Sequence, residues 1–133
     1  MRIGIAETEA ERQAVYRLRY DVYVEEMGRY RGVADHERRM LCEDVDAQSR
    51  IRYIEMDGDV VATARLTWGG DGALPQRMID QYGLSPFLAE LPASAIAVGE
   101  RSMVRPHLRG TDLLLTLMCN GMSWVNDNRI ELF

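Results

Sequence analysis

The chain has 133 residues, a length that predicts one domain with a hydrophobic core of its own. Hydrophobic residues make up 47% of the sequence, so a disordered chain is not expected. The net charge of −5 argues against a nucleic-acid-binding protein. There is no apolar run as long as a membrane span and no signal peptide after Met1, which predicts a cytoplasmic protein.

The 16 basic residues are all arginine, and lysine is absent. Arginine binds carboxylate and phosphate through paired hydrogen bonds, so one interpretation is an anion-rich partner; the other is codon bias in a GC-rich genome. Cys42 and Cys119 lack a metal-binding spacing, and we expect no metal site. Both cysteines are predicted to be small core residues in a reducing compartment.

The first half of the chain predicts a strand, a helix, a loop and a hairpin. Residues 2–6 form the short strand, and residues 8–11 carry a capping-box pattern from which a helix runs to about Glu26. Residues 28–40 have no clear period and are predicted to be a loop. Residues 50–68 form the hairpin, with its turn at Asp57 and Gly58. Strict alternation would place on one face Val60, Ala62, Ala64, Leu66 and Trp68, and on the other Val61, Thr63, Arg65 and Thr67.

The second half predicts a short helix from Gln76 to Tyr82, a connection with two prolines, and a strand over residues 95–104. Pro106 cannot donate a sheet hydrogen bond, so this strand should stop near Arg105. Residues 109–112 then predict a turn and a helix cap, which offer free backbone N–H groups to a phosphate or pyrophosphate. An apolar stripe predicts the helix that follows, and residues 129–133 predict a last strand. The stripe comprises Leu113, Leu114, Leu117, Met118, Gly121, Trp124 and Val125.

This order of elements predicts an α/β (α+β) domain of three layers, with a mixed, mostly antiparallel sheet between helices. The last strand–helix–strand unit is expected to be a right-handed crossover between parallel strands.

Residues 95–125 resemble the acyl-donor signature of the GNAT acyltransferase superfamily. In that family a bulged strand binds the pantetheine arm of an acyl thioester, and the following turn binds the pyrophosphate of coenzyme A. Arg109 matches the first position of that turn, whereas Asp112 and Leu114 replace its later glycines. A carboxylate at Asp112 would oppose a pyrophosphate, which favours acyl carrier protein over coenzyme A. The resemblance assigns to donor binding Met103, Val104, Arg105, Arg109, Gly110, Thr111 and Asp112.

Within that superfamily the chain is similar to the acyl-homoserine lactone synthases and the long-chain N-acyl amino acid synthases. The matching motifs are residues 19–23, 43–46, 64–66 and 100–102. Met103 stands where the family's arginine would follow the serine, with Arg101 as its substitute, and the family's tryptophan after Tyr23 is absent. The resemblance implies that the substrate amine is bound by Arg19, Tyr23, Glu43, Asp46, Arg65 and Arg101.

The GNAT fold usually continues with one more helix and two more strands after the point where this chain ends. We therefore expect a single GNAT-like domain over residues 1–133 that is truncated or takes its missing strands from elsewhere. An open sheet edge favours pairing with another chain, so we expect either a homo-oligomer or the ordered part of a longer protein.

Glu100 and Ser102 are the catalytic candidates. In a regular strand they would share a face with Ile96, Val98 and Val104. Glu100 would then be partly desolvated, its pKa would rise, and it would suit a general base that takes a proton from an ammonium group. The alternative for Glu100 is a structural ion pair with an arginine. Nearby Gly99 predicts a bulge or, equally, plain close packing.

The other charged candidates each have two interpretations. Glu43 and Asp46 either have a functional role, in which they hold the amine or orient Arg19 and Arg65, or form a solvated acidic run that initiates a turn. Arg65 lies mid-strand, where a charge requires a partner, and an ion pair with that acidic run could be structural or catalytic. The arginines at positions 105 and 109 either hold a phosphate or belong to a solvated basic loop.

The sequence thus predicts an N-acyltransferase that moves an acyl group from acyl carrier protein or acyl-CoA to a small-molecule amine. The alternative enzyme is a small-molecule acetyltransferase that uses acetyl-CoA. The alternative of another class is a catalytically inactive GNAT-like module that binds an acyl ligand or a partner.

Overall fold

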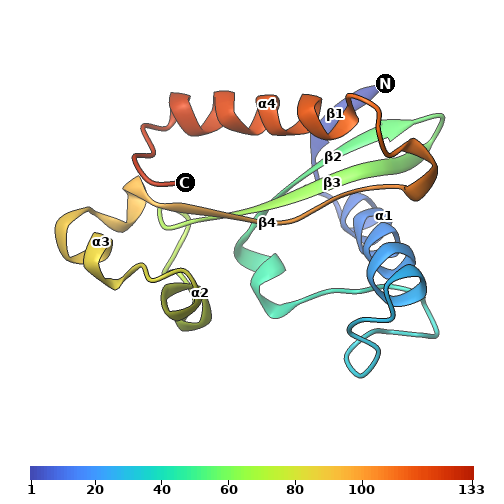
Figure 1. Cartoon of the computed structure of the whole chain (residues 1–133), viewed down its shortest axis with the longest axis horizontal. Coiled ribbons are helices and arrows are strands. Elements are labelled where there is room, and N and C mark those ends of the chain that lie inside the picture. Colours follow the sequence, from blue (N-terminus) through green and yellow to red (C-terminus); the bar gives the residue numbers. More distant parts are fainter.

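A four-stranded antiparallel sheet with strand order β1-β2-β3-β4 forms the middle layer of the computed structural model, which describes residues 1–133 (Figure 1). Helix α4 covers one face of the sheet, and the other helices lie on the opposite side, which confirms the three layers. The strands are β1 (Arg2–Ile5), β2 (Arg50–Met56), β3 (Asp59–Trp68) and β4 (Ala97–Val104). The helices are α1 (Glu9–Arg19), α2 (Gln76–Gln81), α3 (Ser85–Glu90) and α4 (Leu113–Asp127).

Helix α1 begins at the predicted capping box. The Thr8 hydroxyl accepts a hydrogen bond from the backbone N–H of Glu11, whose carboxylate accepts one from the N–H of Thr8. The backbone donors of Thr8 and Glu7 lower the pKa of Glu11 to about 2. The helix continues as a π-helical segment over Tyr20–Glu26, so the predicted end near Glu26 is confirmed.

The hairpin of β2 and β3 turns at Asp57 and Gly58, both with positive φ, as predicted. Its register contains a bulge, because Glu55 pairs with Val60 whereas Ile54 pairs with Ala62. Val61 is the extra residue. The bulge places Val60 in the core beneath α1 and Val61 in the core beneath α4, so the predicted faces are wrong for these two and correct from Ala62 onward.

Strand β4 carries a second bulge, at Arg101 and Ser102. Glu100 pairs with Arg65 and Met103 with Thr63, so the two bulge residues lie opposite one residue of β3. Arg101 has a φ of 56°, in the left-handed region. The prediction that Glu100 and Ser102 share a face is therefore wrong. A bulge was expected at Gly99, and it lies slightly further along the strand, at Arg101 and Ser102.

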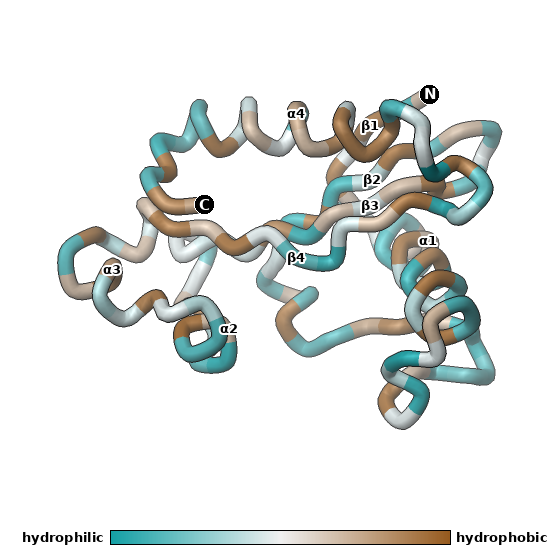
Figure 2. Tube along the Cα trace, in the orientation of Figure 1, coloured by the Kyte–Doolittle hydropathy of each residue, from teal (hydrophilic) through white to brown (hydrophobic).

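Helix α4 begins directly after Asp112, as predicted, but the Asp112 side chain makes no capping hydrogen bond. Of the predicted apolar stripe, Leu113, Leu117 and Val125 are buried, whereas Leu114 and Met118 stay partly exposed. Figure 2 shows the apolar residues of α4 gathered in its first turns, next to β1 and β2. This part of the helix closes the core on that face of the sheet.

Three other predictions need correction. Residues 129–133 do not form the predicted strand. Leu132 makes a single bridge to Ile96, and this bridge has the predicted parallel direction. Helix α3, which begins with Pro86 in its first turn, was not expected in the connection. Cys42 and Cys119 are both exposed and free, not core residues. None of the helices has the length and apolarity to cross a membrane.

Candidate active site

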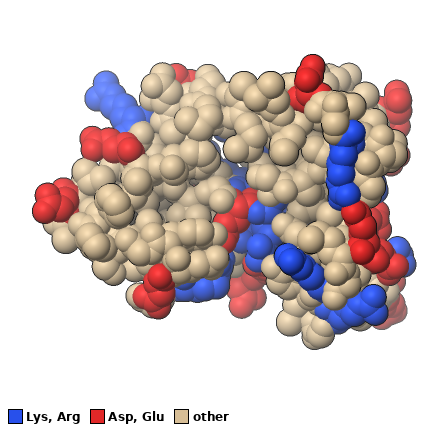
Figure 3. All heavy atoms as spheres, in the orientation of Figure 1, with Lys and Arg blue, Asp and Glu red and all other residues tan.

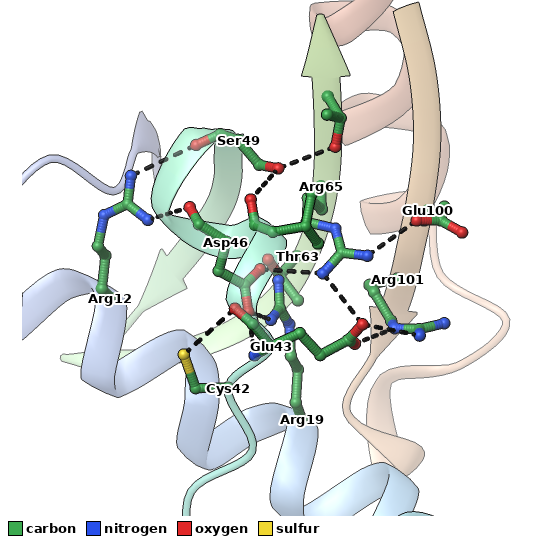
Figure 4. Close-up of polar contacts among 12 residues, drawn as sticks. Arg12, Arg19, Cys42, Glu43, Asp46, Ser49, Thr63, Arg65, Glu100 and Arg101 are labelled. Atoms are coloured by element: carbon green, nitrogen blue, oxygen red, sulfur yellow. Dashed lines mark hydrogen bonds and ion pairs between the residues drawn. The ribbon is translucent and has the colours of Figure 1, made fainter. Parts of the chain in front are cut away.

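Asp46 lies at the centre of a buried network of ion pairs (Figure 4). Its carboxylate accepts hydrogen bonds from Arg19 Nη1 at 2.7 Å, from Arg65 Nη1 at 3.0 Å and from the backbone N–H of Glu43 at 2.7 Å. Asp46, Arg19 and Arg65 are each at most 1% exposed. Burial acts to raise the pKa of Asp46, but the charges of Arg19 and Arg65 and these hydrogen bonds leave it lowered.

A short 3₁₀ turn over Asp44–Gln48 holds Asp46 against the sheet. Arg12 of α1 donates to the carbonyl oxygen of Asp46 at 2.7 Å, and the Ser49 hydroxyl bonds the Thr67 hydroxyl of β3 at 2.8 Å. Helix and sheet therefore both anchor the turn. The interpretation of a solvated acidic run is wrong for Asp46, and the predicted ion pair between Arg65 and the acidic cluster is confirmed.

Glu100 extends the network toward the surface. Its carboxylate accepts hydrogen bonds from Arg65 Nη2 at 2.8 Å, from Arg77 Nη2 at 3.0 Å and from the Tyr82 hydroxyl at 2.6 Å. Burial alone would raise its pKa, but these donors lower the pKa to about 2. The expected rise is wrong, because charged donors and not apolar side chains surround the carboxylate. A group this acidic holds positive charge better than it accepts a proton at neutral pH.

Glu43 and Arg101 form a further, partly buried part of the network. Arg101 Nη2 donates to Glu43 Oε2 at 3.1 Å, with a parallel bond from Nε to Oε1. The Arg101 guanidinium also lies 5.7 Å from the ring centroid of Tyr23 and 5.2 Å from that of Tyr30. The bulge in β4 is what directs Arg101 toward Glu43, since its backbone adopts the left-handed conformation there.

A hollow of 580 Å³ opens onto these charges, and we call it the carboxylate hollow. Figure 3 shows acidic and basic side chains meeting in the middle of this face of the molecule. The network behind the hollow contains four arginines and three carboxylates, so one positive charge is in excess. The hollow is lined by Tyr30, Val33, Glu43, Arg77, Gln81, Tyr82, Gly99, Glu100 and Arg101.

A second hollow, of 570 Å³, lies between the π-helical segment, the end of β4 and the start of α4. We call it the turn groove. It brings together five of the seven residues predicted to bind the acyl donor, Met103, Val104, Arg109, Gly110 and Thr111, with Ser102 and Tyr23. The predicted Arg105 and Asp112 do not line it.

Neither arginine of the turn is free in this structure. Arg105 Nη1 donates to Asp21 at 3.1 Å, and Arg109 forms a two-bond pair with Glu26, one bond of which measures 2.9 Å. The hydrogen bonds to Glu26 raise the pKa of Arg109. A phosphate in the turn groove would have to replace Glu26 at Arg109 or bind through backbone N–H groups.

Arg77, Tyr82 and Tyr30 belong to the site but were not predicted from the sequence. Arg77 and Tyr82 lie on and just after a helix that was expected, yet nothing in that short helix connects them with Glu100. Only the packing of α2 beside β4 brings them together. Tyr30 lies in the loop after the π-helical segment, where the sequence shows no period.

A protein-family model described as "Acetyltransferase (GNAT) domain" matches residues 18–119. The chain belongs to the GNAT acetyltransferase family. This match confirms the predicted superfamily and the prediction of an acyltransferase. A search of curated protein sequences found no significant match.

Solved structures of two acyl-homoserine lactone synthases share the fold of this GNAT domain. The CoA-dependent synthase BjaI, solved with SAM and isopentyl-CoA, is 21% identical with a TM-score of 0.64, over 89% of this chain and 55% of that one. The CoA-dependent synthase MesI is 20% identical with a TM-score of 0.68, over 96% of this chain and 65% of that one. The GNAT domain therefore spans 55% to 65% of the length of these relatives. The likeness confirms the predicted fold class.

Proposed function

We propose that this GNAT domain is an N-acyltransferase that moves an acyl group from a pantetheine thioester to the amine of a small molecule such as an amino acid. The observation that carries the proposal is the bulge in β4, which lies between the two hollows. Ser102 lines the turn groove and Arg101 lines the carboxylate hollow. A thioester bound in the turn groove would meet an amine bound in the carboxylate hollow.

The donor is expected to lie along the end of β4, with its phosphate at the turn of Gly110 and Thr111. The two solved relatives are described as CoA-dependent, which favours acyl-CoA. Asp112 beside the turn favours the single phosphate of acyl carrier protein. We therefore expect one of these two donors, and assays with both thioesters of the same acyl group distinguish them.

The acceptor is expected in the carboxylate hollow, where Glu43 and Glu100 attract its ammonium group. Arg77 has a half-exposed side chain and contributes to the excess positive charge, so it suits the carboxylate of an amino acid. The ammonium group first loses a proton to solvent. The resulting amine attacks the thioester carbonyl, the C–S bond breaks, and the leaving sulfur takes up a second proton from the attacking nitrogen. A backbone N–H at the bulge is the expected donor to the oxyanion.

Glu100 orients the acceptor in this scheme and does not act as the base, because its pKa of about 2 makes it a weak proton acceptor. Glu100→Gln should raise KM for the amine by about tenfold or more, the size of one lost charge-assisted bond. Glu90→Gln, the same change on exposed α3, is the matched control. Thioester consumption is followed with a panel of amino acids and amines, and unchanged KM in Glu100→Gln would contradict the role.

The alternative is a catalytically inactive binding module. It is favoured by Asp112 and Leu114 at the glycine positions of the signature, and by the carboxylate partners of Arg105 and Arg109. The same assay decides, since a module of this kind would bind the acyl thioester without consuming it in the presence of any amine.

Pairing of another strand with the edge of β4 is also proposed. Beyond the bridge at Ile96, this edge pairs with no strand. A second copy of the chain could add a strand here, and light scattering should then detect a homodimer. A stable monomer at high concentration would contradict this. The expected cytoplasmic location likewise stays a prediction.

A further inference from the structure

A third hollow, of 210 Å³, lies between α4 and the sheet, and we call it the α4 hollow. Figure 3 shows the surface hollowed out beneath α4. Its walls come from β2, β3, β4, α4 and the last residue of the chain, and they include Ala64, Leu66, Leu117, Met118 and Phe133. Ser102 of β4 lines both this hollow and the turn groove, so the two adjoin.

Arg52 of β2 also lines the α4 hollow and has no carboxylate partner. It is 7% exposed, and its Nε atom is buried without any hydrogen-bond partner. Its Nη1 donates to the neutral amide oxygen of Asn120 at 2.6 Å. Burial, and then the nearby charge of Arg50, lower the pKa of Arg52. The two fully buried arginines, Arg19 and Arg65, each pair with Asp46.

Arg52 lies against helix α4 at Gly121. A Cβ atom at Gly121 would lie 3.8 Å from Arg52 Nε, an ordinary van der Waals contact, so this glycine and the arginine are direct neighbours. The guanidinium also lies 5.9 Å from the ring centroid of Trp124. These contacts hold a buried cation at the β2 side of a largely apolar space. An unpaired buried charge is costly, so the site is incomplete without an anion or another strong acceptor.

The dimensions of the hollow limit what can reach this cation. Strands β2 and β4 are two strand spacings apart, or about 10 Å. The volume of 210 Å³ holds roughly seven groups of the size of a water molecule, at about 30 Å³ each. A chain of six to eight non-hydrogen atoms, at about that size, would extend from the bulge at Ser102 to Arg52.

We propose that the α4 hollow takes the acyl chain of the donor, and that Arg52 binds a carboxylate at the far end of that chain. The donor is then the monothioester of a short dicarboxylic acid. This inference rests on the proposed function, which places the thioester carbonyl at the bulge of β4. The apolar walls contact the methylene groups, and the terminal carboxylate supplies the charge that Arg52 lacks.

Hexanoyl-CoA and adipoyl-CoA test the proposal, because both acyl groups have six carbons and only the second ends in a carboxylate. Calorimetry should show adipoyl-CoA binding at least about tenfold more tightly, the effect of one charge-assisted pair. Arg52→Met should abolish this preference and also raise the melting temperature of the free protein, because it removes an unpaired buried charge. Arg50→Met is the matched control: Arg50 pairs with Asp71 near the surface, and its loss should leave the preference intact.

Gly121→Leu tests the location of the chain separately. The new side chain should fill the α4 hollow, weaken the binding of both six-carbon thioesters by about tenfold or more and leave acetyl-CoA binding unchanged. Equal affinity of the wild type for adipoyl-CoA and hexanoyl-CoA, or a preference that survives in Arg52→Met, would overturn the inference and leave the proposed function standing. Failure of these acyl groups to bind both as coenzyme A thioesters and as acyl carrier protein thioesters would overturn the inference and the proposed function together.

Discussion

Replacement of Asp46 by asparagine should destabilise the protein severely. The change keeps the shape of the side chain and removes its charge. Arg19 then has no carboxylate within reach, because Asp46 is its only ion-pair partner. Two further Arg19 atoms, Nε and Nη2, are already buried without partners. Arg65 keeps Glu43 and Glu100, so Arg19 accounts for most of the expected loss.

An uncompensated charge at 0% exposure costs about 3–5 kcal/mol. Unfolding entropy is about 2.1 cal/mol/K per residue, or roughly 0.28 kcal/mol/K for this chain, so the melting temperature should fall by about 11–18 °C. Calorimetric melting at pH 7 measures both quantities. The difference in stability between the wild type and Asp46→Asn should shrink in acid. Folding lowers the pKa of Asp46, so the wild type loses the stability that the charged carboxylate contributes as the pH falls through the pKa of the folded state.

Asp71→Asn is the matched control for this experiment. Asp71 likewise accepts two hydrogen bonds from arginine side chains, here both from Arg50, but its side chain is 24% exposed. Loss of a partly exposed pair should cost about 0–1 kcal/mol. If Asp46→Asn costs no more than Asp71→Asn, the buried network does not hold the site together and the reasoning is refuted.

Three more outcomes are expected. Folding lowers the pKa of Glu100 from 4.5 to about 2, so its contribution to stability is complete above pH 4.5 and is lost as the pH falls toward 2. In urea denaturation, the free energy of unfolding of Glu100→Gln should therefore fall less steeply with decreasing pH than that of the wild type. Thr8→Ala removes the cap of α1 and should cost about 1 kcal/mol in the same assay without changing KM for the amine. By calorimetry, Arg109→Ala should weaken donor binding by about 1–3 kcal/mol, whereas Glu26→Gln frees Arg109 and should tighten it; unchanged affinity in both variants would reject the placement of the donor phosphate.

Many local features of the fold could be predicted from neighbouring residues. The capping box at Thr8, the hairpin turn at Asp57 and Gly58, and the stop of β4 before Pro106 were all correct. Each depends on hydrogen bonds or steric limits within a few residues, so the tertiary structure has little influence on it. The apolar period likewise predicted α4, whose start after Asp112 was correct.

The sequence by itself also carried the motifs around Arg19, Asp46, Arg65 and Glu100, whose resemblance to one family grouped these charges, and the ion pairs of the structure join them. Only the tertiary structure decided what those charges do to one another. The bulge at Arg101 turns Ser102 away from Glu100, and the packing of α2 adds Arg77 as a further donor to Glu100. The pKa of a carboxyl group depends on the few groups within hydrogen-bond distance of it. Around Glu100 those groups come from distant parts of the chain, so the direction of its pKa shift could not be predicted from the local sequence pattern.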